Sequence, residues 1–196
     1  LMERFAEDPE LTGRLREGLW EQGLLRASVI PGKEGEGSKF SDYFNFSEAL
    51  AKIPSHRALA LFRGRNQGVL ALDLLPGEPG GAGEDPDAVW VQTLAAHFGI
   101  QDRGRPADAW LRETARKAWR IKLFTRLDLD LKSRLLAAAE EEAIRVFARN
   151  LSALLLAAPA GRLPTLGLDP GLRTGVKVAV VDGTGRVAAT DTLYPH

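Results

Sequence analysis

The chain of 196 residues has no cysteine, no net charge and no long apolar run, and each absence excludes a class of protein. Without cysteine, disulfide bonds and thiolate metal sites are excluded, and a reducing cytoplasm is the expected location. Because 26 basic residues balance 26 acidic ones, the chain lacks the positive excess of a dedicated nucleic-acid-binding domain. The longest apolar stretch, 151–158, includes Ser152 and is too short to cross a bilayer, so no membrane association is expected.

The first residues also lack the basic and then apolar pattern of a signal peptide, since Glu3, Arg4, Glu7 and Asp8 lie among them. Leu1 precedes Met2 within an expected helix. This start predicts that the chain is cut from a longer protein.

Most of the chain has helical patterns. Asp8 and Pro9 are typical of a helix start, and Gly23 of its end. Ser47 and Ser55 resemble helix caps and predict a short helix over 48–52 and a longer one over 56–66. Further helices are expected over 87–98, 106–126 and 131–157, and two isolated strands over 24–30 and 69–75. In the last long helix, one apolar face is predicted to hold Leu136, Ala143, Phe147, Leu151 and Leu154.

The pattern changes after a linker at 159–164. Apolar runs over 165–168, 176–181 and 187–193 predict three strands, with a hairpin turn at 182–185. The middle strand is apolar on both faces, which is typical of a sheet covered by helices on both sides. No helical sequence follows, so these strands are expected to be a truncated domain, and any homodimer through the uncovered sheet to be an effect of truncation. The fold class predicted is mainly α with a small β part (α+β).

Asp169 is the candidate catalytic residue. It ends an apolar strand and precedes a Pro-Gly turn, where a carboxylate can hold a divalent metal or face a phosphate backbone. A single carboxylate binds Mg²⁺ weakly, and Asp182 is separated from Asp169 by a strand length. Alternatively, Asp169 orders its own turn by accepting backbone N–H bonds. We therefore expect no catalysis by this chain, and no metal or cofactor.

Basic residues are the candidates for nucleic-acid binding. Arg112, Arg116 and Arg120 recur at a spacing of four, so they form a basic face with Lys117 on the helix over 106–126. Such a face contacts phosphates, or it is solvated, or it pairs with the acidic run 140–142. The remaining candidates flank the turn after Asp169 or cluster near Gly64 and Gly68: Arg173 and Lys177, and Arg57, Arg63 and Arg65.

The aromatic residues are expected in cores rather than in binding sites. Four tryptophans lie on predicted helices, where packing is favoured over base stacking. The aromatic cluster over 40–46 is also expected to pack inward. The tryptophans are Trp20, Trp90, Trp110 and Trp119.

Several ordered blocks resemble the Tex family of bacterial transcription accessory proteins. They are 39–44 (Lys-Phe-Ser-Asp-Tyr-Phe), 54–58 with 63–66, 146–150 with 154–159, 167–175 (Gly-Leu-Asp-Pro-Gly-Leu-Arg-Thr-Gly), and 194–196. The resemblance implies a helical region with a helix-turn-helix-like element, and then a YqgF-like RNase H-fold domain. Helix-hairpin-helix and S1 RNA-binding domains follow in that family. The resemblance further implies that residues 1–160 are the helical region and that residues 161–196 are the first strands of the YqgF-like domain.

The function implied by this resemblance is that of a non-catalytic scaffold within an RNA- or DNA-binding transcription factor, because Tex-like proteins are regarded as lacking a full nuclease set. In RNase H-fold nucleases and resolvases, Asp169 matches the first-strand carboxylate, so a metal-dependent nuclease is one alternative. The same strand and turn are similar to those of actin-like ATPases. A third possibility is a protein-interaction surface for transcription machinery, formed by the uncovered sheet or by residues 40–46.

Overall fold

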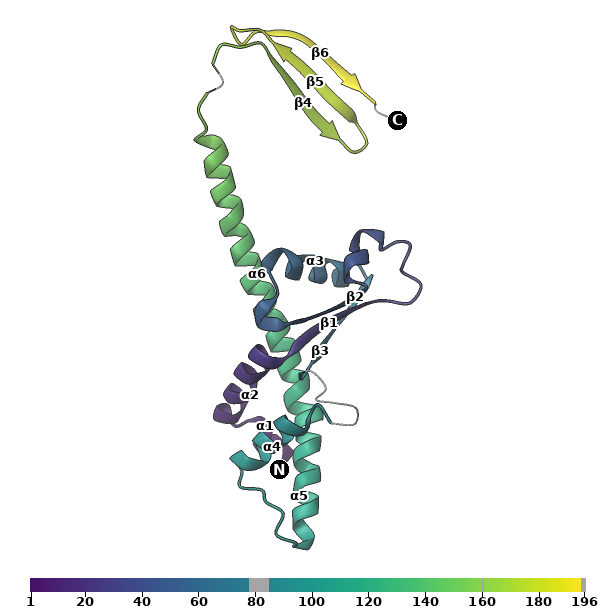
Figure 1. The fold of residues 1–196 in the computed structure, drawn as a ribbon, viewed down its shortest axis with the longest axis vertical. Helices are drawn as coiled ribbons and strands as arrows, with labels where there is room; N and C mark the ends of the chain where they lie inside the picture. The colour runs from purple at the N-terminus through teal and green to yellow at the C-terminus, as the bar shows by residue number, and fades with distance from the viewer. Residues whose placement is uncertain (78–84, 160, 195–196) are drawn as a thin grey trace. The chain divides into compact units, whose positions relative to one another are not determined.

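The computed structural model describes residues 1–77, 85–159 and 161–194 (Figure 1). The chain divides into two compact units, Leu1–Phe147 and Ala148–His196, which are described separately here. The last two residues of the expected second domain, 195 and 196, lie outside the described part. No helix in the described part is long and apolar enough to cross a membrane.

The first unit begins with two helices, α1 (Met2–Ala6) and α2 (Pro9–Gln22). Asp8 is the N-cap of α2, as its sequence predicts: its carboxylate accepts a hydrogen bond from the Leu11 backbone N–H at 2.8 Å. Leu11, Leu15 and Leu19 are fully buried on one face of α2. The predicted start, face and end of this helix are confirmed.

A three-stranded antiparallel sheet follows, in the order β2-β1-β3. Its strands are β1 (Leu24–Val29), β2 (Asn45–Ala49) and β3 (Leu70–Leu75). Leu25 lies opposite Leu74, and Ala27 lies opposite Leu72, so one face of the sheet is buried. On the other face Arg26 pairs with Asp73 at 3.3 Å and is exposed to solvent. The sequence predicted β1 and β3 but not their pairing.

The short helix predicted over 48–52 is wrong. Ser47 pairs with Arg26 within the sheet, so strand β2 continues to Ala49, and only a 3₁₀ turn, η2 (Leu50–Lys52), remains. Cross-strand pairing with β1 therefore decides the conformation of a segment whose local pattern favoured a helix. The proposed Ser55 cap is also wrong, because Pro54 is the N-cap of α3 (Ser55–Asn66) and no side chain caps that helix.

Aromatic side chains around the 3₁₀ helix η1 (Ser38–Tyr43) pack inward as predicted. Phe40 is 4% exposed, and Tyr43, Phe44 and Phe46 are partly buried against the core. The rings of Tyr43 and Phe46 lie edge to face, with centroids 5.8 Å apart. The cluster therefore packs on the core, although Tyr43, Phe44 and Phe46 keep part of their surface exposed.

After β3 the chain forms a continuous helical rod rather than two separate helices, and the end of this rod beyond Phe147 belongs to the second unit. After α4 (Ala88–His97), α5 (Pro106–Ala118) passes through a π-helical turn, η3 (Trp119–Leu123), into α6 (Phe124–Leu155). No glycine or proline interrupts 107–155, and the acidic residues near the expected break are paired. Asp128 binds Lys132 at 2.8 Å, and Asp130 binds Arg16 at 3.0 Å.

The apolar face predicted for the last helix is confirmed only at Leu136, which packs against the core, and is wrong for Phe147, Leu151 and Leu154. The buried side chains of α6 are those of Leu127, Leu131, Leu135 and Ala139, whereas Phe147 is 67% exposed and Leu154 75% exposed. Both sets recur at helical spacing, because this helix is rich in apolar residues. Periodicity identified the helix but not the face that the rest of the unit covers.

The second unit contains an antiparallel sheet in the order β4-β5-β6, as the sequence predicts. The strands are β4 (Thr165–Gly171), β5 (Gly175–Val181) and β6 (Val187–Leu193). Because directly opposite residues share a face, Leu168 and Val178 lie on one face, and Asp169 and Lys177 lie on the other. The predicted fold class, mainly α with a small β part, is confirmed.

Candidate nucleic-acid interface

Asp169 lies on β4, near the end of the strand. In the register of the sheet it is opposite Lys177 of β5, which is in turn opposite Thr192 of β6. Asp169 is exposed and lies at a shallow hollow lined by residues of all three strands, among them Gly167 and Ala179. Its nearest neighbour in register is therefore a lysine and not a second carboxylate that could add a metal ligand.

The other carboxylates of this sheet do not join Asp169. Asp191 of β6 pairs with Val178 and so lies on the opposite face, and Asp182 lies beyond the far end of β5. Within residues 1–77, 85–159 and 161–194, no group of three His, Cys, Asp or Glu residues could hold a metal ion. Sequence reasoning missed Asp191, although the two-residue period of the strand would have assigned its face.

Asp182 has a structural task in the predicted hairpin turn. One carboxylate oxygen, Oδ1, accepts hydrogen bonds from the Thr184 hydroxyl at 2.6 Å, the Thr184 N–H at 2.8 Å and the Arg186 N–H at 3.1 Å. These bonds, led by the one from the Thr184 side chain, lower the pKa of Asp182. The carboxylate therefore stabilises the turn at 182–185, and the predicted hairpin turn is confirmed.

Arg173 and Lys177 flank the turn after Asp169, as the sequence indicated. Arg173 is exposed in the turn between β4 and β5, which Gly175 closes with a positive φ of 73°. Lys177 is exposed on β5. Neither forms an ion pair with another residue of the described part, so both remain candidate phosphate contacts.

The four basic residues of the predicted face on α5 and η3 each have an acidic partner. Arg112 binds Asp102 at 2.7 Å, and Glu113 accepts from Arg116 at 3.4 Å and lies 3.7 Å from Lys117. All four side chains are more than half exposed. A phosphate group would therefore have to compete with carboxylates for these cations.

Arg120 has the most buried of these partners. Its Nε donates to Asp87 at 2.6 Å, and its Nη2 lies 3.6 Å from Asp85. The hydrogen bond to Asp87 raises the pKa of Arg120. Pairing of this face with the acidic run 140–142 is wrong, because Glu141 and Glu142 bind Arg145 one turn further along α6.

Two of the three residues in the smaller basic group on α3 have structural partners, whereas Arg63 is exposed and forms no ion pair within the described residues. Arg57 binds Glu48 at 2.7 Å, and the guanidinium of Arg65 lies 4.9 Å from the centre of the Phe62 ring. Gly64 is buried against Leu70 of β3, so its lack of a side chain permits close packing of helix and sheet. The glycine does not mark a phosphate-binding turn.

Three of the four tryptophans pack as predicted, and one does not. Trp90 and Trp119 are buried and stacked, with ring centroids 5.7 Å apart and an interplanar angle of 10°. Trp20 is partly buried, under the guanidinium of Arg134 at 4.2 Å. Trp110 is 59% exposed, so the prediction of a core position is wrong for this residue. It lies on the outward side of α5, and helical spacing alone could not assign that side.

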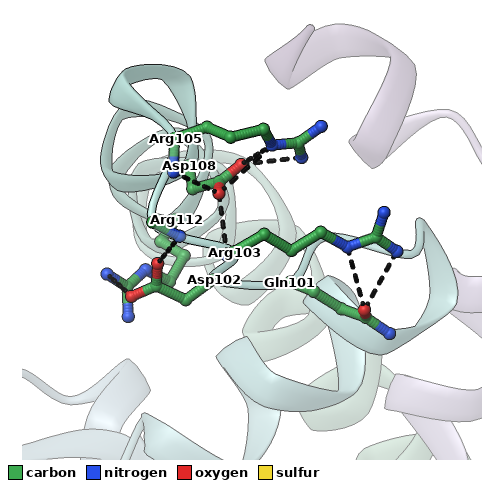
Figure 2. Close-up of polar contacts among 7 residues, drawn as sticks. Gln101, Asp102, Arg103, Arg105, Asp108 and Arg112 are labelled. Carbon is green, nitrogen blue, oxygen red and sulfur yellow. Dashed lines mark hydrogen bonds and ion pairs between the residues drawn. The ribbon is translucent and has the colours of Figure 1, made fainter.

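A second arginine cluster, at residues 101–105, was missed as a unit. Figure 2 shows that it forms a loop held by the carboxylate of Asp108, which is fully buried in the first turn of α5. This carboxylate accepts the backbone N–H groups of Arg103 at 2.8 Å and of Arg105 at 3.0 Å. The available signal was an acidic residue just after Pro106, at the start of a helix.

The Asp108 carboxylate also binds the Arg105 guanidinium, at 2.8 Å to Nη2 and 3.0 Å to Nε. This bond and the one from the Arg103 N–H are the main reasons that the pKa of Asp108 is lowered to about 2. Arg112 fixes the other side of the loop through Asp102, which also accepts the Gly104 N–H at 3.1 Å. The loop therefore has a defined conformation that presents two arginines, Arg103 and Arg105.

Comparison with known proteins gives two matching family models. One, described as Tex central region-like, matches residues 1–147, and the other, described as Tex protein YqgF-like domain, matches residues 163–196. Protein YhgF of Escherichia coli (strain K12) is 52% identical over 196 residues, and the transcriptional accessory protein Tex of Neisseria gonorrhoeae is 51% identical. Each alignment covers 100% of this chain and 25% of the relative.

A more distant relative is S1 RNA-binding domain-containing protein 1 of Pongo abelii. It is 28% identical over 183 residues, which are 90% of this chain and 17% of that protein. The chain thus spans about a quarter of the length of the bacterial relatives that it matches.

Proposed function

Because this chain belongs to the Tex family, we propose that it is a non-catalytic scaffold of a transcription accessory protein that binds nucleic acid. In this role its first unit holds the protein's nucleic-acid-binding elements in place and adds weak contacts to phosphates. RNA is the proposed ligand, because one relative carries S1 RNA-binding in its name. The proposal places this function in the cytoplasm, together with the transcription machinery as a further partner.

One observation supports the non-catalytic part of the proposal: the carboxylates of the β4–β6 sheet do not converge. Asp169 is opposite Lys177, Asp191 lies on the other face, and Asp182 is committed to its own turn. Two-metal phosphoryl transfer needs several carboxylates around ions about 4 Å apart. A single carboxylate beside a lysine supplies neither the ligand number nor the negative charge for such a site.

The paired basic face supports weak rather than tight binding. Arg112, Arg116 and Arg120 are exposed, but each is partly neutralised by a carboxylate at 2.6 to 3.4 Å. A phosphate that binds here replaces one ion-pair partner with another and gains little net energy. The contacts should therefore orient a bound strand and make its binding depend on salt.

A triple variant tests these contacts. Arg112→Ala, Arg116→Ala and Arg120→Ala together should weaken the binding of single-stranded RNA by the full-length protein. They should also flatten the slope of log K against log salt by up to about 2, since each lost contact removes about 0.7. The measurement is a fluorescence-anisotropy titration between about 50 mM and about 200 mM salt.

A matched control removes three arginines that are paired on other surfaces of the first unit: Arg16→Ala, Arg134→Ala and Arg145→Ala. It makes the same change in net charge and also breaks ion pairs. Equal effects of the two triple variants would show that only the total charge matters and would remove α5 from the interface. Unchanged binding in the first variant would limit this surface to a scaffold.

A further inference from the structure

We propose that the arginine loop, residues 101–105, together with the cavity beside it, binds one unstacked nucleotide of a single-stranded nucleic acid. In this arrangement the base enters the cavity and the adjoining phosphate meets the guanidinium groups of the loop. The inference rests on the proposed function, because it assigns a specific site to the binding of nucleic acid. It differs from the α5 face in that two of its cations are not neutralised by carboxylates.

The loop is preorganised by internal hydrogen bonds. Asp108 is fully buried and binds the backbone of Arg103 and Arg105, and Asp102 binds the backbone of Gly104 and the Arg112 side chain. Gly104 has a positive φ of 75°, which lets the chain turn between the two arginines. Both acidic residues of this region are therefore occupied, and little conformational entropy remains to be lost when a ligand binds.

The arginines provide uncompensated positive charge. The guanidinium of Arg103 donates only to the neutral amide oxygen of Gln101, at 3.1 and 3.3 Å. Arg4 of α1 forms no ion pair with any residue of the described part. Arg105 is paired with Asp108, yet its side chain is 59% exposed. In Figure 2, Arg103 and Arg105 extend to the same side of the loop, whereas Arg112 lies on the other side with Asp102.

The cavity has the volume and lining for a base. It measures about 270 Å³, and its lining includes Phe5, Phe98, Ile100 and Leu111, with Arg4, Gln101 and Arg105 among its polar residues. The rings of Phe5 and Phe98 are 4.6 Å apart and form part of an apolar wall. A base buries its flat face against such a wall and hydrogen-bonds through its edge to groups such as the Gln101 amide. Phosphate alone would use the guanidinium groups but not the apolar wall.

The test is the binding of a fluorescent ten-nucleotide oligo(U) RNA to the chain, with Arg103→Ala as the main variant. Arg14→Ala is the matched control, because Arg14 is exposed on α2 and has no ion pair within the described residues. Arg103→Ala should weaken binding about tenfold, the size of one charged hydrogen bond, and Arg14→Ala should change it less than twofold. Arg103→Lys should restore part of the loss. Circular dichroism of each variant reports whether the helices are intact.

A second readout locates the base. Photocrosslinking with 4-thiouridine in the same RNA should label the cavity wall around Phe98 and Ile100. Inorganic phosphate and a ten-residue polyglutamate peptide serve as competitors, and neither should displace the RNA at equal charge concentration. Equal losses in the Arg103 and Arg14 variants, crosslinks that avoid the cavity, or displacement by polyglutamate would each overturn this site. If the unaltered chain bound no RNA, the proposed nucleic-acid binding by this chain would fall with it.

Discussion

Replacing Gly64 by alanine tests how closely α3 packs on the first sheet. An alanine in the interior of a helix usually stabilises it by about 1 kcal/mol relative to glycine. Here the new methyl carbon would lie 2.5 Å from Cδ1 and 2.8 Å from Cγ of Leu70, which is itself only 1% exposed. Because Leu70 has no free space to move into, overpacking should cost about 1–3 kcal/mol. Gly64→Ala should therefore destabilise the first unit or leave it no more stable.

Gly13→Ala provides the matched control, because Gly13 also lies within a helix, α2, and nothing is within 4 Å of its added carbon. This variant should gain the full helix-propensity term of about 1 kcal/mol. The two variants should then differ by about 2 kcal/mol, which corresponds to about 6 °C in melting temperature for a chain of this size. Fluorescence of the buried Trp90 and Trp119 follows the melting of the first unit. Equal stabilisation by both alanines would refute the close packing of Gly64 on Leu70.

Two further predictions concern the core and the loop. Leu131→Ala should destabilise the first unit by about 2–5 kcal/mol, because Leu131 is fully buried. Phe147→Ala should change the stability by less than about 0.5 kcal/mol, because Phe147 is 67% exposed. Urea unfolding of the two variants measures both effects. The reverse order would contradict the assigned face of α6. The pKa of Asp108 in the folded chain is about 2, below its ordinary value of 3.8. The ionised carboxylate therefore stabilises the fold above about pH 4, and this stabilisation is lost as the pH falls toward about 2. The urea midpoints of the unaltered chain and of Asp108→Asn should therefore differ at neutral pH and converge near about pH 2. A difference between the two midpoints that does not change with pH would contradict the role of this carboxylate.

Local signals in the sequence were sufficient for elements whose ends are set by their own residues. Asp8 with Pro9 marks the start of α2, and Asp182 with Gly185 marks the last hairpin, because capping and turn bonds form within a few residues. Strand β2 was missed because its conformation depends on pairing with β1, about twenty residues earlier in the chain. The α5–α6 rod was predicted as two helices, over 106–126 and 131–157, although no glycine or proline separates them, and Asp128 and Asp130 between them are paired with Lys132 and Arg16.

The candidate site was predictable only in part, because its ion pairs join residues that are far apart in the sequence. The sequence identified exposed basic residues on α5 but not their partners. Asp85, Asp87 and Asp102 come from segments whose positions depend on tertiary packing. Arg103 and Arg105 were visible in the sequence, but the grouping of Arg105 with Arg4 at one cavity depends on where α1 lies against α5. The face of Asp191 could have been assigned from the alternation of the strand, once its register was known.

The central claim, that this chain takes part in binding nucleic acid without cleaving it, is tested most directly by one assay. A labelled single-stranded RNA is incubated with the full-length protein and Mg²⁺ or Mn²⁺, in parallel with the Asp169→Asn variant, and binding and strand length are both measured. Both proteins should bind the RNA and leave it intact. Metal-dependent cleavage that disappears in Asp169→Asn would contradict the account and establish Asp169 as a catalytic residue.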